Sequence, residues 1–493
     1  MRAAVLRISL AAVLVAPTAA AFVSGGYFDQ ARLVLAVAAW LLVLVVAALA
    51  PIPLPRSRSG LVAVAGLVLL AGWVLASMAW APLPGGAWDD AQRVALYAGG
   101  LLAACGLLRD RASRLAVEPA LVGGALVLAV YALSERLLPG VFELEQSRSA
   151  LGRLDQPLTY WNAEGSVMAV ALVLAVRMLG TPQRPRALRA GAAVALPWIA
   201  LALYLTLSRG ALAAAGIGII ALALLDSSRV QAKAIALAVA AGVVAVAAAE
   251  AFPGVLGSDG SAGDGAVVLV VLLVVSAVGA AIAVRWSGSA APARDPRRVR
   301  TVALPAILLA VVALGALVVV SGAGREPPGL GGASEARADR LRSLGSNRDE
   351  YWRVAFDVAA AHPLLGHGSG SFDIDWSRER TITEGVRDAH SLTIETAAEL
   401  GAVGLLLLAL FVGGVAASVP AALRRDPVLA VGATAGLVAW VLHAQLDWLW
   451  EMPAATLNAV LLAALVVTLA DPVQEDREGD GGQQHDDHVG GVA

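Results

Sequence analysis

Uncharged apolar runs of about 20 residues recur along most of the chain, and they limit its folding more than any other feature. A helix of that length crosses the roughly 30 Å hydrocarbon core of a bilayer. Inside lipid, only helices and closed barrels pair all of their backbone polar groups. The runs are continuous rather than alternating, which favours helices over barrel strands. The sequence therefore predicts an all-α, polytopic membrane bundle.

The composition excludes the main alternatives. The chain is 58% apolar and 15% charged, whereas soluble proteins are about 45–50% apolar and about 25% charged. This excludes a soluble enzyme and a disordered protein. The formal net charge of −2 gives no sign of a nucleic-acid partner. Cys105 is the only cysteine, so the chain is not a disulfide scaffold.

About fourteen spans of suitable length can be placed along the sequence. The first resembles a signal peptide, with Arg2 and Arg7 before a short apolar core, but the many later spans favour a retained helix. The expected spans are 5–23, 31–50, 60–80, 91–108, 117–138, 163–179, 190–207, 210–225, 234–251, 266–284, 301–322, 402–420, 428–445 and 453–470.

Charge placement predicts the orientation in the membrane, since Lys and Arg of short loops stay cytoplasmic. With the N-terminus inside, alternate short loops carry the cations. The opposite loops 24–30 and 252–265 carry none, and 446–452 is acidic. We therefore expect a plasma-membrane protein with an even number of spans and both termini in the cytoplasm.

Two outer segments, 139–162 and 323–401, are too long and polar to be simple connectors, and long irregular segments are usually functional. The expected regions are N-terminal helices in 1–150, central helices in 151–322, a large extracytoplasmic loop in 323–401, C-terminal helices in 402–470 and a disordered cytoplasmic tail in 471–493.

Two single residues are candidates for chemistry. Arg209 lies in Ser208-Arg209-Gly210 between two apolar runs. It is either an arginine that extends to the membrane surface or an anion site, since guanidinium matches phosphate oxygens. His390 precedes Ser391, the expected N-cap of a helix running to Gly401. A helix N-terminus favours neutral histidine, which can act as a general base, although a loop histidine can also be structural.

The remainder of the large loop predicts local structure. Apolar residues at helical spacing predict a helix from Asn347 to His362, ended by Pro363, and the glycines that follow predict a tight turn. A nucleotide-binding loop is excluded because no strand precedes it and no Lys follows. No metal site is expected at His362 and His367. Asp447 follows an apolar helix on the outer side, where it can assist a site.

These motifs together resemble the O-antigen ligase and polymerase superfamily over residues 150–470. His390-Ser391, nine residues and then Gly401-Ala402-Val403-Gly404 fit its His-[Asn/Ser/Gln]-x9-Gly-x-x-Gly pattern. Arg348, Trp352 and the run from Pro363 to Phe372 resemble its large-loop signature. Ser208-Arg209-Gly210 resembles a further hallmark, and Arg153 through Tyr160-Trp161-Asn162 resembles a weaker one.

The resemblance implies a glycosyltransferase with a C-type membrane fold. Such enzymes move a glycan from undecaprenyl diphosphate to an acceptor hydroxyl, with inversion and without metal or cofactor. It assigns His390 as general base and Arg209 and Arg348 as diphosphate ligands, with Arg353 an alternative for Arg348. The implied substrate-binding positions are Arg153, Asn162, Trp352, Arg353, Ser391 and Asp447.

The sequence departs from the usual pattern in two ways, with about fourteen spans where about twelve are typical and with His367 in the glycine-rich turn. The main alternative is a transporter or flippase of an amphiphilic substrate, and another is a scaffold that binds a partner. Transporters often show two matching halves, and none are evident here.

Overall fold

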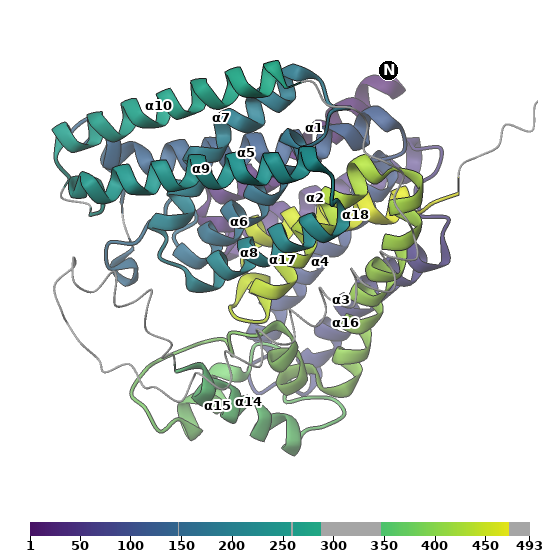
Figure 1. Cartoon of the computed structure of the whole chain (residues 1–493). Helices are drawn as coiled ribbons and strands as arrows, with labels where there is room; N and C mark the ends of the chain where they lie inside the picture. Colours follow the sequence, from purple (N-terminus) through teal and green to yellow (C-terminus); the bar gives the residue numbers. More distant parts are fainter. Residues whose placement is uncertain (146, 258–259, 287–346, 473–493) are drawn as a thin grey trace, which may run out of the picture.

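The computed structural model describes residues 1–145, 147–257, 260–286 and 347–472. Every helix or strand element within these ranges is helical (Figure 1). The predicted all-α class is therefore confirmed. The expected span 301–322 and nearly all of the predicted tail lie outside the described residues.

The described helices follow the predicted apolar runs closely. They are α1 (Arg2–Ala21), α2 (Asp29–Leu49), α3 (Arg58–Ala76), α4 (Pro84–Leu107), α5 (Arg111–Leu137), α6 (Trp161–Leu179), α7 (Arg186–Leu205), α8 (Arg209–Leu225), α9 (Arg229–Ala251), α10 (Ala262–Arg285), α14 (Arg348–Ala361), α15 (Phe372–Glu379), α16 (Leu392–Arg425), α17 (Pro427–Ala444) and α18 (Pro453–Leu469).

Ten of the described helices are long and apolar enough to cross a membrane. α8 and α18 are apolar but shorter, and α4 carries Asp89, Asp90 and Arg93 near its start. The structure thus supports a membrane protein with many apolar helices, while the total of fourteen spans stays a prediction.

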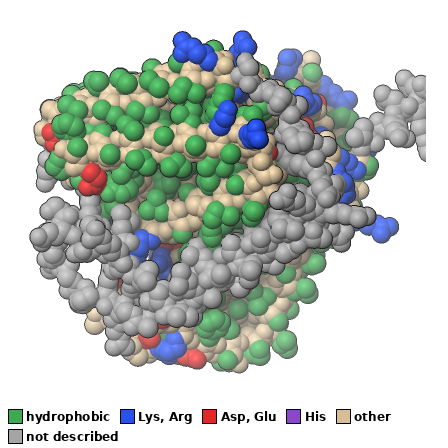
Figure 2. Space-filling view, viewed as in Figure 1, with side chains coloured by type: hydrophobic (Ala, Val, Ile, Leu, Met, Phe, Trp, Pro, Cys, Tyr) green, Lys and Arg blue, Asp and Glu red, His purple; other side chains and the backbone are tan. Residues whose placement is uncertain are grey.

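The helices divide into a buried centre and an apolar periphery. All of α18 and most of α6 are buried, although neither shows a strong apolar stripe. A helix that is apolar all round suits such a central position. α9 and α10 lie along one side of the bundle, and their outer faces expose valine, leucine and isoleucine side chains (Figures 1 and 2). These exposed apolar faces are the surfaces expected to meet lipid.

The segment from α14 to the start of α16 forms a small body at one end of the bundle (Figure 1). α14 matches the helix predicted for 347–362, and it ends next to Pro363 as expected. Its apolar face packs with α15 in a core of its own, which includes Tyr351, Trp352, Phe372 and Trp376. The large loop is therefore partly a folded unit.

α16 contains a break at Gly401, whose φ of 63° and ψ of −161° are accessible almost only to glycine. The glycine-rich turn inserts at this break. Its Gly368 N–H donates to the Glu399 carbonyl at 2.8 Å, and Ala402 N–H donates to the Pro363 carbonyl at 2.9 Å. The turn thus pairs with backbone groups that a continuous helix would use itself.

We predict that Gly401→Ala destabilises the protein by roughly 1–3 kcal/mol, because it imposes a strained backbone. A Cβ at this position would also lie 2.4 Å from the Leu364 carbonyl oxygen. Thermal unfolding in detergent measures the effect. The matched control is Gly413→Ala in the same helix, where nothing lies within 4 Å of the added carbon. Equal unfolding temperatures for the two variants would contradict the prediction.

Candidate functional site

One cavity of about 220 Å³ brings together residues from four separate parts of the chain. Its lining includes Arg209, Arg348 and His390, which the motifs singled out. Arg153 and Asn162 also line it, and Glu384 is the one acidic residue among the described residues that line it. Three arginines against one carboxylate make the cavity suitable for an anion.

Arg209 is the first residue of α8, and its place follows from the cap of that helix. Ser208 is the N-cap, and its Oγ accepts a hydrogen bond from Ala211 N–H at 3.2 Å. Leu207, just before it, has a positive φ of 50°, so the chain turns sharply into the helix. The N-terminus of α8 therefore adds the positive end of a helix dipole to the arginine at the cavity.

Arg348 is held by a buried carboxylate. Its Nη2 donates to Asp447 Oδ2 at 2.9 Å. The same carboxylate accepts hydrogen bonds from Tyr160 Oη at 2.5 Å and from Asn162 Nδ2 at 2.6 Å. Asp447 is 1% exposed and is absent from the cavity lining, although its three side-chain partners, Arg348, Tyr160 and Asn162, line the cavity. It therefore positions the lining groups from behind.

Segment 139–162 also contributes to the cavity. The Arg153 guanidinium lies 4.3 Å from the centre of the Trp161 ring, within the range of a cation–π contact. This contact sets an arginine at the cavity opposite α14. The weaker motif that suggested Arg153 and Asn162 thus corresponds to one wall of the site.

His390 lies at the cavity in a left-handed backbone conformation, with φ at 57°. Its Nδ1 lies 2.9 Å from the Asp388 carbonyl oxygen, which can only accept, so Nδ1 carries the proton and Nε2 is the basic nitrogen. Burial lowers the His390 pKa most, Asp447 opposes this, and the Arg348 charge lowers it further. The neutral form, which can accept a proton, is therefore favoured at neutral pH.

Besides Asp447, three of the residues proposed from the sequence do not line the cavity. Trp352 Nε1 donates to the Ala389 carbonyl at 3.0 Å, so it supports the His390 loop from the small core. Ser391 occupies the N-cap position of α16, but its side chain makes no cap hydrogen bond. Instead Glu395 accepts a bond from Ala389 N–H at 2.8 Å. Both contacts converge on the residue preceding His390.

Arg353 is the third, and it lies on the exposed side of α14. Its guanidinium pairs with Glu350 and Asp357 on the same helix, at 2.9 and 3.0 Å. The geometry thus brings Arg348 rather than Arg353 to the cavity.

Two further polar residues at the cavity carried no sequence signal for a site. Glu384 accepts hydrogen bonds from Tyr351 Oη at 2.7 Å and from Asn347 Nδ2 at 2.8 Å. Tyr351 is one of the residues whose helical spacing predicts α14, and nothing in that spacing indicates a site. By contrast, the rings of His362 and His367 stack 4.7 Å apart, and His367 pairs with Asp375, away from this cavity.

A family comparison agrees with this geometry. Residues 260–409 match the model of a family described as O-antigen ligase. This match supports the predicted resemblance to the O-antigen ligase and polymerase superfamily. The matched range contains Arg348, His390 and Gly401, whereas Arg209 and Asp447 lie before and after it. No curated protein matched the chain.

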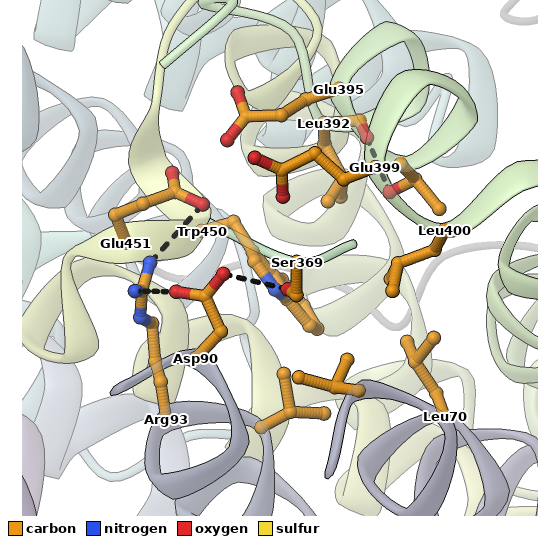
Figure 3. Close-up of a pocket in the computed structure, with 13 residues that line it drawn as sticks. Leu70, Asp90, Arg93, Ser369, Leu392, Glu395, Glu399, Leu400, Trp450 and Glu451 are labelled. Atoms are coloured by element: carbon orange, nitrogen blue, oxygen red, sulfur yellow. Dashed lines mark hydrogen bonds and ion pairs between the residues drawn. The ribbon is translucent and has the colours of Figure 1, made fainter. Parts of the chain in front are cut away.

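This O-antigen ligase-like protein has a second, smaller cavity, which is lined mainly by carboxyl groups and by apolar side chains (Figure 3). Arg93 pairs with Asp90 and, at 3.3 Å, with Glu451. Carboxylate oxygens of Asp388, Glu395 and Glu451 all lie within 4.8 Å of one another. The segment from 388 to 395 therefore contributes to both regions: His390 lines the arginine-lined cavity, and Asp388 and Glu395 belong to the acidic cluster.

The acidic cluster holds protons at neutral pH. Burial is the main cause that raises the pKa of Asp388 to about 7 and that of Glu451 to about 8. Arg93 opposes both shifts, and neighbouring carboxylates add to them.

We predict that the protein loses stability as the pH rises from about 4 to about 8. In this window the folded cluster keeps protons that the unfolded chain, with ordinary carboxyl pKa values near 4, has released. Unfolding temperatures in detergent across this range measure the effect. Glu451→Gln should flatten the curve, whereas Asp357→Asn, on the exposed face of α14, should leave it unchanged. An identical slope in Glu451→Gln and the unaltered protein would refute the cluster as its cause.

Proposed function

We propose that the protein is a membrane glycosyltransferase that moves a glycan from undecaprenyl diphosphate to an acceptor hydroxyl, in ligation or polymerisation of a surface polysaccharide. The observation that carries the proposal is the meeting of Arg209, Arg348 and His390 at one cavity. The match of residues 260–409 to the O-antigen ligase family supports it. The fold implied by that resemblance is the C-type membrane glycosyltransferase fold.

The arginine-lined end of the cavity suits the diphosphate of the donor. A glycosyl diphosphate already has a good leaving group if its charge is stabilised. Arg209, at the N-terminus of α8, and Arg348, fixed by Asp447, supply that charge. Because Asp447 is buried and fully engaged, Arg348 is ordered before the substrate arrives.

His390 completes the reaction as general base. Its Nε2 takes the proton of the acceptor hydroxyl while that oxygen attacks the anomeric carbon. The bond between the anomeric carbon and the diphosphate oxygen breaks, and its electron pair leaves with the diphosphate. Attack from the face opposite the leaving group inverts the anomeric centre. The hydrogen bond from Nδ1 to the Asp388 carbonyl keeps the required tautomer and stabilises the imidazolium that forms.

The bilayer supplies the donor, and the site is proposed to lie on the extracytoplasmic face. In this arrangement the apolar helices hold the polyprenyl chain, and the body formed by α14 and α15 covers the sugar. Both termini are then cytoplasmic, in agreement with the placement of arginines in the short loops.

We predict that His390→Ala lowers kcat by about 10²–10⁴-fold, the usual contribution of a general base. Arg209→Ala and Arg348→Ala should each lower kcat/KM by about 10²–10³-fold, since each removes stabilisation of the leaving group. Glycan transfer from purified undecaprenyl-diphosphate glycan measures these rates. Arg353→Ala is the matched control for Arg348→Ala, because its guanidinium pairs on the other side of the same helix. Full activity of the His390→Ala and Arg209→Ala variants would contradict this mechanism.

We also predict that a cysteine at Asp357, exposed on α14, reacts with a membrane-impermeant thiol reagent in intact cells. A cysteine at Gln183, exposed between α6 and α7, should react only after permeabilisation. The native Cys105 is buried and gives little background. The reverse pattern would overturn the proposed orientation.

A further inference from the structure

Close packing between α8 and α17 lies directly behind the arginine-lined cavity. Gly218 of α8 packs against α17, where a Cβ would lie 3.1 Å from Ala439 Cβ and 3.4 Å from the Ala435 carbonyl oxygen. Such contacts between small residues let membrane helices approach each other closely. Ala435, Ala439 and His443 are spaced four residues apart, so the histidine continues the same face of α17.

His443 is an unusual residue for this position. It is 1% exposed, and neither ring nitrogen has a hydrogen-bond partner among the residues that the structure describes. Buried polar atoms without partners reduce stability, so the ring is costly at this position. The imidazole therefore calls for an explanation in terms of what it contacts.

The contact is with the residue that follows Arg209. A Cβ on Gly210 would lie 2.9 Å from both His443 Nε2 and Cδ2. The imidazole edge thus occupies the space that any side chain at position 210 would need. Gly210 is in the first turn of α8, so the ring rests against the turn that carries Arg209.

The residues just after His443 contact the other two elements of the site. Gln445 Oε1 accepts a hydrogen bond from Thr393 Oγ1 at 2.6 Å, in the helix that follows His390. Asp447 holds Arg348. Segment 443–447 therefore touches the three elements that bear Arg209, His390 and Arg348, and His443 makes the contact toward Arg209.

We propose that His443 is a positioning residue, which fixes the first turn of α8 through Gly210 and so sets Arg209 at the cavity. This inference rests on the proposed function, in which Arg209 binds the donor diphosphate. His443 itself does not line the cavity, and its role is exerted through the turn it supports.

Gly210→Ala tests the contact. We expect the added methyl group to displace the turn and lower kcat/KM by up to about 100-fold, the scale of a 1 Å misplacement. The loss should appear mainly as a higher KM for the undecaprenyl-diphosphate glycan, because His390 is untouched. Gly216→Ala, in the same helix with nothing within 4 Å, is the control and should behave like the unaltered protein.

The decisive variant is Gly210→Ala combined with His443→Ala. The second substitution removes the ring that the methyl group strikes, so most of the lost donor affinity should return. If His443 only stabilised the fold and did not act through Gly210, the His443→Ala substitution would not restore the KM of the Gly210→Ala variant. His443→Ala alone leaves the turn unsupported and should also raise KM, which provides a second reading if Gly210→Ala does not fold.

Thermal unfolding with and without added undecaprenyl diphosphate reports donor binding independently of turnover. We expect a reduced ligand-induced shift in Gly210→Ala and a restored shift in the double variant. An unchanged shift and KM in both single variants, or no recovery in the double variant, would overturn the positioning role. If the Arg209→Ala variant also binds undecaprenyl diphosphate normally, the proposed function itself is contradicted. If Arg209→Ala loses binding while the Gly210 and His443 variants keep it, only the role of His443 is refuted.

Discussion

The buried carboxylate of Asp447 is the interaction on which the arrangement of the site depends. It joins Tyr160 and Asn162 at the start of α6 to Arg348 at the start of α14, although these residues are far apart in sequence. A buried carboxylate must be paired, because an isolated charge is costly to remove from water. Its three partners satisfy it and are thereby fixed in place. The anion-binding groups are consequently ordered by a residue that does not itself line the cavity.

The two cavities are lined by different ionisable groups, and segment 388–395 contributes to both surroundings. Arginines gather where the diphosphate is proposed to bind, whereas carboxyl groups, Asp388 and Glu395 among them, gather around the second cavity. His390 lies at the boundary and is held through its neighbours, since Trp352 and Glu395 both bond to the backbone of Ala389. The acidic cluster is thus part of the support of the proposed base.

Local patterns predicted local elements well. The spacing of apolar residues and Pro363 predicted α14 and its end, because both depend only on neighbours in the chain. The sequence predicts the position of the N-cap, Ser391, correctly, but the Ser391 side chain makes no cap hydrogen bond. Glu395 instead accepts a hydrogen bond from the Ala389 N–H. Which polar group takes such a bond depends on the path of the chain before the helix, and that path is set by packing against α14.

The sequence by itself determined an apolar helical bundle, a resemblance of several motifs to one superfamily and the residues around which a site could form. These follow from hydropathy and from short spacings, which act locally. Only the tertiary structure decided that Arg348 rather than Arg353 reaches the cavity, and that Gly401 breaks α16 to receive the glycine-rich turn. It also decided that His443 packs on Gly210. These outcomes rest on contacts between distant segments, whose geometry no local pattern contains.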